Sequence, residues 1–245
     1  MALREELVRE GNWLFRWRSY PPVVLLLLVI ASLPAARNPD TWQHHRAWVA
    51  FCVAVSIIGE LIRCVTVGHA PAGTSGRNTR GQLAEQVNTT GIYSVVRHPL
   101  YLGNFVIYMG AAMYPGLWWM AAIVALVFWL YYERIMLAEE EFLRGRYGAA
   151  YEEWAARTPP FIPRLGGWKP AALPFSLKTV LKREYAGVFG ITTAYFVLHV
   201  ASMAIFRRRV DVSPLWWGVF ALGLVTYLVL RTLRRHTRAL KVEGR

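Results

Sequence analysis

Cysteine is scarce in this sequence, and its scarcity narrows the chemistry that the chain can support. Only two cysteines occur in 245 residues, Cys52 and Cys64, and both fall within one apolar stretch. They lack the clustered Cys/His spacing of a zinc or redox site. We therefore expect both to be small buried side chains, and we expect no metal site.

Acidic residues are also in short supply. The chain has 15 Asp and Glu against 28 Lys and Arg, which gives a formal net charge of +13, yet 55% of its residues are hydrophobic. A nucleic-acid-binding protein can share this charge, but it does not carry several charge-free apolar runs of membrane-spanning length. The basic excess lies mostly between these runs, where topology and anionic headgroups account for it. We expect an integral membrane protein with lipid neighbours and no nucleic-acid partner.

The longest charge-free interval lies between Arg97 and Glu133, and Tyr114-Pro115-Gly116 interrupts it near its middle. Such a turn divides the interval into two membrane segments, so that the chain leaves the membrane on the side where it entered. The sequence predicts an all-α, polytopic bundle of about six transmembrane segments with a helical hairpin. The expected segments are residues 20–36, 48–67, 101–114, 118–132, 185–206 and 215–230.

Charge also predicts the orientation of these segments. With the N-terminus in the cytoplasm, three basic regions lie inside: residues 68–100, 133–184 and the tail from Arg231. Arg207-Arg208-Arg209 is the exception, because this topology places the basic run outside, whereas basic segments favour the cytoplasmic side. From 133 to 151 apolar residues recur at helical spacing without a proline, so the fourth segment is expected to continue as a cytoplasmic helix. The chain then divides into N-terminal segments with a flexible loop, a core and two additional C-terminal segments with a basic tail: residues 1–90, 91–170 and 171–245.

Two polar motifs flank the hairpin. Arg97-His98-Pro99-Leu100-Tyr101-Leu102-Gly103 precedes it, and Glu139-Glu140-Glu141 with Tyr147-Gly148 follows it. Alone, the first is explained as an interfacial anchor with a proline that starts a helix, and the second as a solvated charge run. Three consecutive glutamates cannot share one helix face, so at least one points elsewhere. The hairpin gathers both motifs at one membrane face, which favours an enzyme site.

Together these motifs resemble the core of the isoprenylcysteine carboxyl methyltransferase family and related phospholipid methyltransferases, membrane enzymes that use S-adenosylmethionine. The resemblance covers roughly residues 91–163, under a third of the chain. Trp154, Thr158-Pro159 and the two later apolar segments depart from the family pattern. The matching residues are Gly91-Ile92-Tyr93, Arg97-His98-Pro99, Tyr101, Gly103, Glu133-Arg134, Glu139-Glu140, Leu143, Tyr147-Gly148, Tyr151 and Pro163.

The resemblance implies specific roles, and the residue types permit them. Glu139 or Glu140 would contact the adenosine or amino group of S-adenosylmethionine, and Arg134 would face the reacting group of the acceptor; Arg134 and Glu140 are the expected catalytic residues. A carboxylate accepts hydrogen bonds from hydroxyl groups or an amine, and Arg holds a carboxylate bidentately. The acceptor is expected to be lipophilic, either an isoprenylcysteine-like carboxylate or a lipid amine. The expected cofactor-binding residues are Arg97, His98, Tyr101, Gly103, Glu139 and Glu140.

Three alternatives remain open at this point. Membrane reductases of the sterol type share an Arg-His-Pro-x-Tyr-x-Gly element and use NADPH, but they usually carry Asn where this chain has Leu100. A haem-binding bundle would need His98 and His199 at one depth. A membrane scaffold without activity gives no reason to gather these polar side chains. Glu60 and Arg63, charged residues inside a predicted span, are either functional or a structural ion pair.

Overall fold

Helices dominate the structure. The computed structural model describes residues 3–36, 46–71, 73–74, 86–208, 210–242 and 244. Within these ranges the pairing of extended backbone is limited to an isolated bridge between Gly91 and Lys169, so the all-α prediction is confirmed. The helices are α1 (Leu3–Trp17), α2 (Pro21–Ser32), α4 (Arg46–Gly68), α5 (Pro99–Met113), α6 (Trp118–Tyr147), α7 (Ala149–Arg157), α8 (Leu177–Arg207) and α9 (Pro214–His236), with 3-10 turns at Leu33–Ala35, Ile92–Ser94 and Leu165–Gly167.

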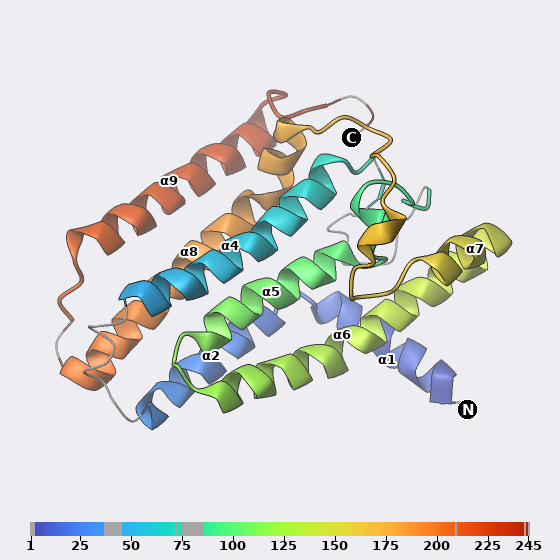
Figure 1. Ribbon diagram of the computed structural model, residues 1–245. Helices are drawn as coiled ribbons and strands as arrows, with labels where there is room; N and C mark the ends of the chain where they lie inside the picture. Colours follow the sequence, from blue (N-terminus) through green and yellow to red (C-terminus); the bar gives the residue numbers. More distant parts are fainter. Residues whose placement is uncertain are drawn as a thin grey trace.

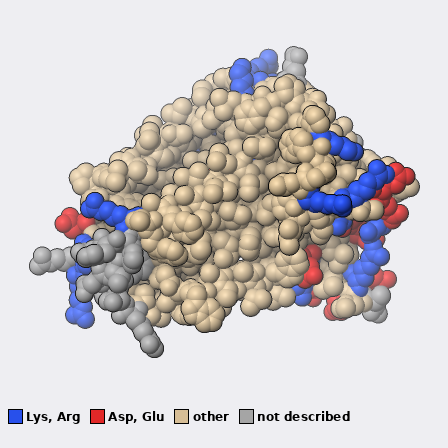
Figure 2. Space-filling view, viewed as in Figure 1, with Lys and Arg blue, Asp and Glu red and all other residues tan. Residues whose placement is uncertain are grey.

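Four of these helices, α4, α6, α8 and α9, are long and apolar enough to cross a membrane. A fifth span is formed if α1 and α2 with the following turn count as one, although this pair is bent by 80°. The third expected segment, α5, is apolar but has only 15 residues. Figure 2 shows charged side chains gathered toward the ends of the visible face, with a wide uncharged surface between them. The chain is a polytopic helical membrane protein.

The helices are arranged around α4 and α5, which run side by side (Figure 1). α8 packs on the other side of α4, and α9 lies outermost against α8. α6 returns beside α5, and α1 crosses the second half of α6. The three regions of the chain, residues 1–90, 91–170 and 171–245, contribute neighbouring helices to one bundle.

The hairpin between α5 and α6 follows the sequence prediction. Pro99 is the first residue of α5, where its missing N–H costs no hydrogen bond. The turn before α6 contains buried Tyr114 and Gly116, whose φ of +68° suits glycine. α6 then continues without a break to Tyr147, which confirms the helical extension up to that residue, and Gly148, with a φ of +53°, ends the helix before the predicted residue 151. Both polar motifs therefore lie at the same end of the bundle.

The opposite end of the bundle carries the basic exception noted in the sequence. α8 ends at Arg207, and Phe206 packs against the same apolar cluster as Tyr114 of the hairpin turn. Arg207 and Arg208 therefore lie at the end away from the polar motifs, as the topology predicted, while Arg209 lies outside the described residues. Cys52 is fully buried in this cluster, as expected, whereas Cys64 is only partly buried.

Candidate active site

The two motifs meet in a compact network of charged side chains. A guanidinium nitrogen of Arg97 donates to Glu140 Oε2 at 2.8 Å, and His98 Nε2 lies 3.0 Å from Glu140 Oε1. The Tyr101 hydroxyl donates to Glu139 Oε1 at 2.6 Å. Two neighbouring glutamates of α6 therefore hold the segment that begins α5.

The backbone before α5 is fixed independently of these side chains. The N–H of Arg97 donates to the carbonyl of Pro159 at 2.9 Å, and the N–H of His98 donates to that of Pro160 at 3.2 Å. The Trp154 indole of α7 also donates to the carbonyl of Tyr93 at 3.2 Å. The proline-rich segment after α7 thus clamps the first motif, and α6 and α7 together support it.

The third glutamate points elsewhere, as the helix geometry required. Glu141 accepts hydrogen bonds from Arg4 of α1 and, at 2.9 Å, from Arg144. Its side chain is 40% exposed, whereas that of Glu140 is 15% exposed. Adjacent residues of α6 therefore provide one carboxylate inside the network and one outside it.

Two of the expected site residues lie elsewhere. Arg134 Nε donates to Glu10 Oε2 of α1 at 2.7 Å. A Cβ at Gly103 would lie 2.6 Å from Cγ of Arg63 and 2.8 Å from the carbonyl oxygen of Gly59. Gly103 thus permits α4 and α5 to pack closely, as small residues do between membrane helices. The other expected residues, Arg97, His98, Tyr101, Glu139 and Glu140, are brought together.

A cavity of about 1070 Å³ extends from this network into the bundle. Its polar end, called the mouth below, is lined by Arg97, His98 and Glu139 of the motifs together with Tyr93 and with Trp154 of α7. On α5 the lining residues run from Pro99 to Ala111, roughly 18 Å at 1.5 Å per residue. The inner wall is apolar, and it includes Leu25, Leu26, Val29, Ile107, Ala111, Val124 and Ile191.

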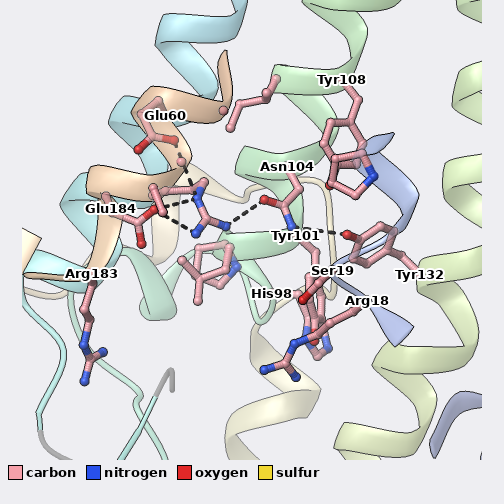
Figure 3. Close-up of a pocket in the computed structure, with 18 of the residues that line it drawn as sticks. Arg18, Ser19, Glu60, His98, Tyr101, Asn104, Tyr108, Tyr132, Arg183 and Glu184 are labelled. Atoms are coloured by element: carbon pink, nitrogen blue, oxygen red, sulfur yellow. Dashed lines mark hydrogen bonds and ion pairs between the residues drawn. The ribbon is translucent and has the colours of Figure 1, made fainter. Parts of the chain in front are cut away.

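A second charged group lines the cavity between its mouth and its apolar wall (Figure 3). Arg63 donates to Glu184 Oε2 through Nε at 3.0 Å and through a terminal nitrogen at 2.8 Å, and to Asn104 Oδ1 at 2.7 Å. Glu60 Oε2 lies 3.7 Å from Arg63 Nε. The sequence singled out Glu60 and Arg63 but missed Glu184. The expected fifth span began at residue 185, whereas α8 begins at Leu177 and carries Glu184 into the bundle.

The protonation of His98 is set by this environment. Burial disfavours a charged imidazole, but the hydrogen bonds and negative charges of Glu139 and Glu140 outweigh burial and raise the pKa of His98 above its usual value. His199, by contrast, stacks on Trp216 with ring centroids 4.5 Å apart, toward the other end of the bundle. The two histidines therefore do not share one depth, which a haem-binding bundle requires.

Fold and site together define a helical membrane protein with a ligand-sized cavity that is polar at one end and apolar at the other. Residues 48–150 match the family model described as phospholipid methyltransferase. The chain belongs to this family, which includes the isoprenylcysteine methyltransferases. No solved structure matches the chain.

Three relatives illustrate the similarity. The cobalt-zinc-cadmium resistance protein CzcN of Cupriavidus metallidurans is 38% identical over 63% of this chain and 67% of its own length. The nickel-cobalt-cadmium resistance protein NccN of Alcaligenes xylosoxydans xylosoxydans is 32% identical over 61% of this chain. The protein-S-isoprenylcysteine O-methyltransferase of Schizosaccharomyces pombe is 35% identical over 31% of this chain. The chain spans 63% of NccN and 32% of the yeast protein, less than two thirds of each.

Proposed function

We propose that this protein transfers a methyl group from S-adenosylmethionine to a lipophilic acceptor, with its site at the cytoplasmic face of the membrane. The observation that carries the proposal is the continuous cavity, in which the motif residues form the polar mouth and apolar side chains form the inner wall. A soluble cofactor fits the mouth, and an acceptor's hydrocarbon chain fits the apolar part. The basic loops at this end favour the cytoplasmic side.

The residues at the mouth fit the cofactor chemically. The Glu139 carboxylate and the aromatic side chains of Tyr93 and Trp154 line the cavity there. Carboxylates accept hydrogen bonds from hydroxyl groups or an amine, and aromatic rings stack on a planar base. The cavity, at about 1070 Å³, is slightly larger than the roughly 300–1,000 Å³ typical of ligand pockets. When bound, S-adenosylmethionine supplies a methyl group activated by a positively charged sulfonium.

The protein's own contribution is positioning and the exclusion of water. Glu140 fixes Arg97 and His98 at the mouth, and Tyr101 fixes Glu139. The apolar wall excludes water from the acceptor. Because the cavity holds the acceptor beside the cofactor, methyl transfer does not require a further collision between the two molecules. We propose that Arg97, His98, Tyr101 and Glu139 bind the cofactor and that Glu140 orders them. Arg134 would act as a positioning residue that holds α1 against α6.

Two relatives are named for metal resistance, and this raises the question of a metal-binding role. Among the residues that the structure describes, no group of three or more His, Cys, Asp or Glu side chains is placed to hold a metal ion.

Calorimetric binding of S-adenosylhomocysteine and of NADPH to the detergent-purified chain tests the proposal. Wild-type protein should bind S-adenosylhomocysteine and not NADPH. Glu139→Gln should weaken this binding about tenfold or more, because a hydrogen bond to a charged group contributes about 1.5–3 kcal/mol. Glu141→Gln is the matched control, since the neighbouring carboxylate faces α1, and its affinity should stay within about twofold of wild type, as for surface substitutions. Binding of NADPH alone, or of neither ligand, would overturn the proposal.

A further inference from the structure

We propose that the line of contact between α8 and α9, called the α8–α9 seam, binds the headgroup of an anionic phospholipid at the membrane face that carries the candidate active site. The site consists of Lys178 and Lys182 of α8 and Arg231 and Arg234 of α9. Both helices lie beyond residues 48–150, the segment matched by the family model. The bound lipid is a partner on the outside of the bundle and not the acceptor in the cavity, so this inference does not depend on the proposed function.

Aromatic contacts define which faces of α8 and α9 meet. Phe196 of α8 packs on Phe220 of α9, with ring centroids 4.5 Å apart. Nearer the start of α8, Phe189 and Tyr185 both pack on Tyr227 of α9, with ring centroids 4.8 and 5.4 Å apart. Residues on one face of a helix recur every three or four positions. The contacting face of each helix can therefore be followed along the sequence beyond these rings.

The same two faces become basic at the end of the pair. Lys182 lies three residues before Tyr185, and Lys178 lies four residues before Lys182, so both continue the contacting face of α8. Arg231 and Arg234 continue the contacting face of α9, one and two turns after its tyrosine. The start of α8 and the end of α9 lie side by side (Figure 1), and the Arg234 guanidinium donates to the Tyr185 hydroxyl at 3.4 Å. Each helix thus contributes two positive side chains to one seam.

These charges lack an acidic counterpart. Residues 185–242 contain a single carboxylate, Asp211, which precedes α9 at the opposite end of the helix pair. Glu184 is paired with Arg63 of α4. Among the residues that the structure describes, none of the four basic side chains forms an ion pair with a carboxylate. Like charges on facing helices repel, and a phosphate group in the seam supplies the missing negative charge.

Tyrosines hold the two arginines without neutralising them. Arg231 donates to the Tyr227 hydroxyl at 3.0 Å, and its guanidinium carbon lies 5.7 Å from the centre of that ring. The guanidinium carbon of Arg234 lies 6.0 Å from the centre of the Tyr185 ring. A guanidinium has five N–H donors, so most of them remain for phosphate oxygens, which arginine binds bidentately. Arg97 of the candidate active site is instead paired with a carboxylate.

The seam lies at the headgroup level of a membrane. Residues 185–206 of α8 and 214–230 of α9 contain no Lys, Arg, Asp or Glu, so both helices change from apolar to basic beside the same tyrosine pair. Tyrosines concentrate at the membrane–water interface, and basic pockets between membrane helices bind anionic headgroups. The outer surface of α9 is open to acyl chains, since a Cβ at Gly218 would meet no atom within 4 Å. Its exposed apolar side chains include Leu222, Val225, Leu228 and Val229.

The positive-inside bias and the helix dipole account for basic residues at this end of α9, but neither requires basic residues of two helices to face each other. A lipid is favoured over free phosphate because the apolar surface of α9 continues directly from the basic seam. The two sources can be separated, since only the lipid carries acyl chains.

Calorimetric titration of short-chain lipids into the full-length chain in detergent tests the site. Dioctanoylphosphatidylglycerol, which is anionic, should bind about tenfold or more tightly than zwitterionic dioctanoylphosphatidylcholine, the ratio expected for one additional charge-assisted hydrogen bond. Inorganic phosphate should bind more weakly than the anionic lipid. Equal affinities for the two lipids would overturn the proposal, and so would phosphate binding as tight as that of the anionic lipid.

Variants on both helices test the position of the site. Arg231→Gln combined with Arg234→Gln should weaken binding of the anionic lipid about tenfold or more, and Lys182→Gln on α8 should weaken it several-fold. The matched control combines Arg146→Gln with Arg164→Gln, which removes the same charge from exposed positions elsewhere and should change the affinity by no more than about twofold.

An equal loss of affinity in the control would assign binding to the overall net charge of +13 and refute the seam. Unchanged affinity in the α8 and α9 variants would refute it as well. None of the substituted residues lines the cavity, so S-adenosylhomocysteine binding should be the same in every variant as in the wild type, whatever the lipid result. Circular dichroism establishes that each variant is folded.

Discussion

The contact between Arg97 and Glu140 allows a quantitative test of how the mouth of the cavity is held. Both side chains are about 15% exposed, and their closest atoms are 2.8 Å apart. Removing one partner of a buried ion pair costs about 3–5 kcal/mol, and a charge-assisted hydrogen bond contributes about 1.5–3 kcal/mol. Since glutamine retains an acceptor oxygen, we expect Glu140→Gln to lower the free energy of unfolding by about 2–4 kcal/mol.

A double-mutant cycle isolates the pair. Arg97→Gln, Glu140→Gln and the double variant would be unfolded in detergent and followed by circular dichroism, with an expected coupling energy of about 1.5–3 kcal/mol. The control cycle uses Glu141 and Arg144, whose side chains are 40% and 34% exposed, and should give about 0.3–0.5 kcal/mol after solvent screening. A coupling energy below about 0.5 kcal/mol would refute the conclusion that Arg97 and Glu140 hold the mouth of the cavity together, because independent sites are additive within that margin.

Three further predictions follow from the geometry. The pKa of His98 is raised in the folded state, so protonated His98 stabilises the fold fully below about pH 6.5, and this stabilisation is lost as the pH rises through the raised pKa. Melting curves recorded from pH 6 upward should show this loss of stability. The His98→Gln variant should not show it. Gly59→Ala places a Cβ 2.6 Å from a backbone oxygen of α5 and should destabilise by about 1–3 kcal/mol relative to Gly218→Ala in thermal unfolding. Arg134→Gln and Glu10→Gln should have equal, small effects of about 0–1 kcal/mol on unfolding, since the pair is partly exposed; an effect of Arg134→Gln alone on S-adenosylhomocysteine affinity would instead place Arg134 in the site.

The sequence predicted the fold where local chemistry determines it. A proline at the start of α5, a glycine at the hairpin turn and an uninterrupted apolar pattern in α6 each specify a helix boundary or its absence. The hairpin then makes it necessary that the motifs before and after it meet. This explains why the contacts among Arg97, His98, Tyr101, Glu139 and Glu140 lie where the sequence expected a site.

Contacts with distant segments could not be predicted in the same way. The partner of Arg134 is Glu10, 124 residues away in the sequence. Glu10 lies on α1, which precedes the expected first span and is bent by 80° relative to it. The function of Gly103 depends on which helix lies opposite, because a glycine permits either a ligand or a backbone to approach. Glu184 was missed because a span predicted from hydropathy stops at a charged residue. A charged residue can nevertheless lie inside a bundle when another helix supplies its partner.

The outermost helix provides a final prediction about how little of the C-terminal part the site requires. α9 packs against α8, and only 6% of its most apolar window is buried within the structure. Of its residues, Tyr227 lines the cavity. Lipid is as apolar as the side chains that α9 covers, so its removal carries no hydrophobic penalty comparable to that in water. A chain truncated after Ser213 should therefore still bind S-adenosylhomocysteine with an affinity within a few fold of the full chain. Truncation after Arg183 also removes most of α8, whose residues line the cavity, and the affinity should then fall further. If the shorter deletion abolishes binding while the protein remains helical by circular dichroism, α9 must order the cavity through α8, and the conclusion that the site does not require α9 would be wrong.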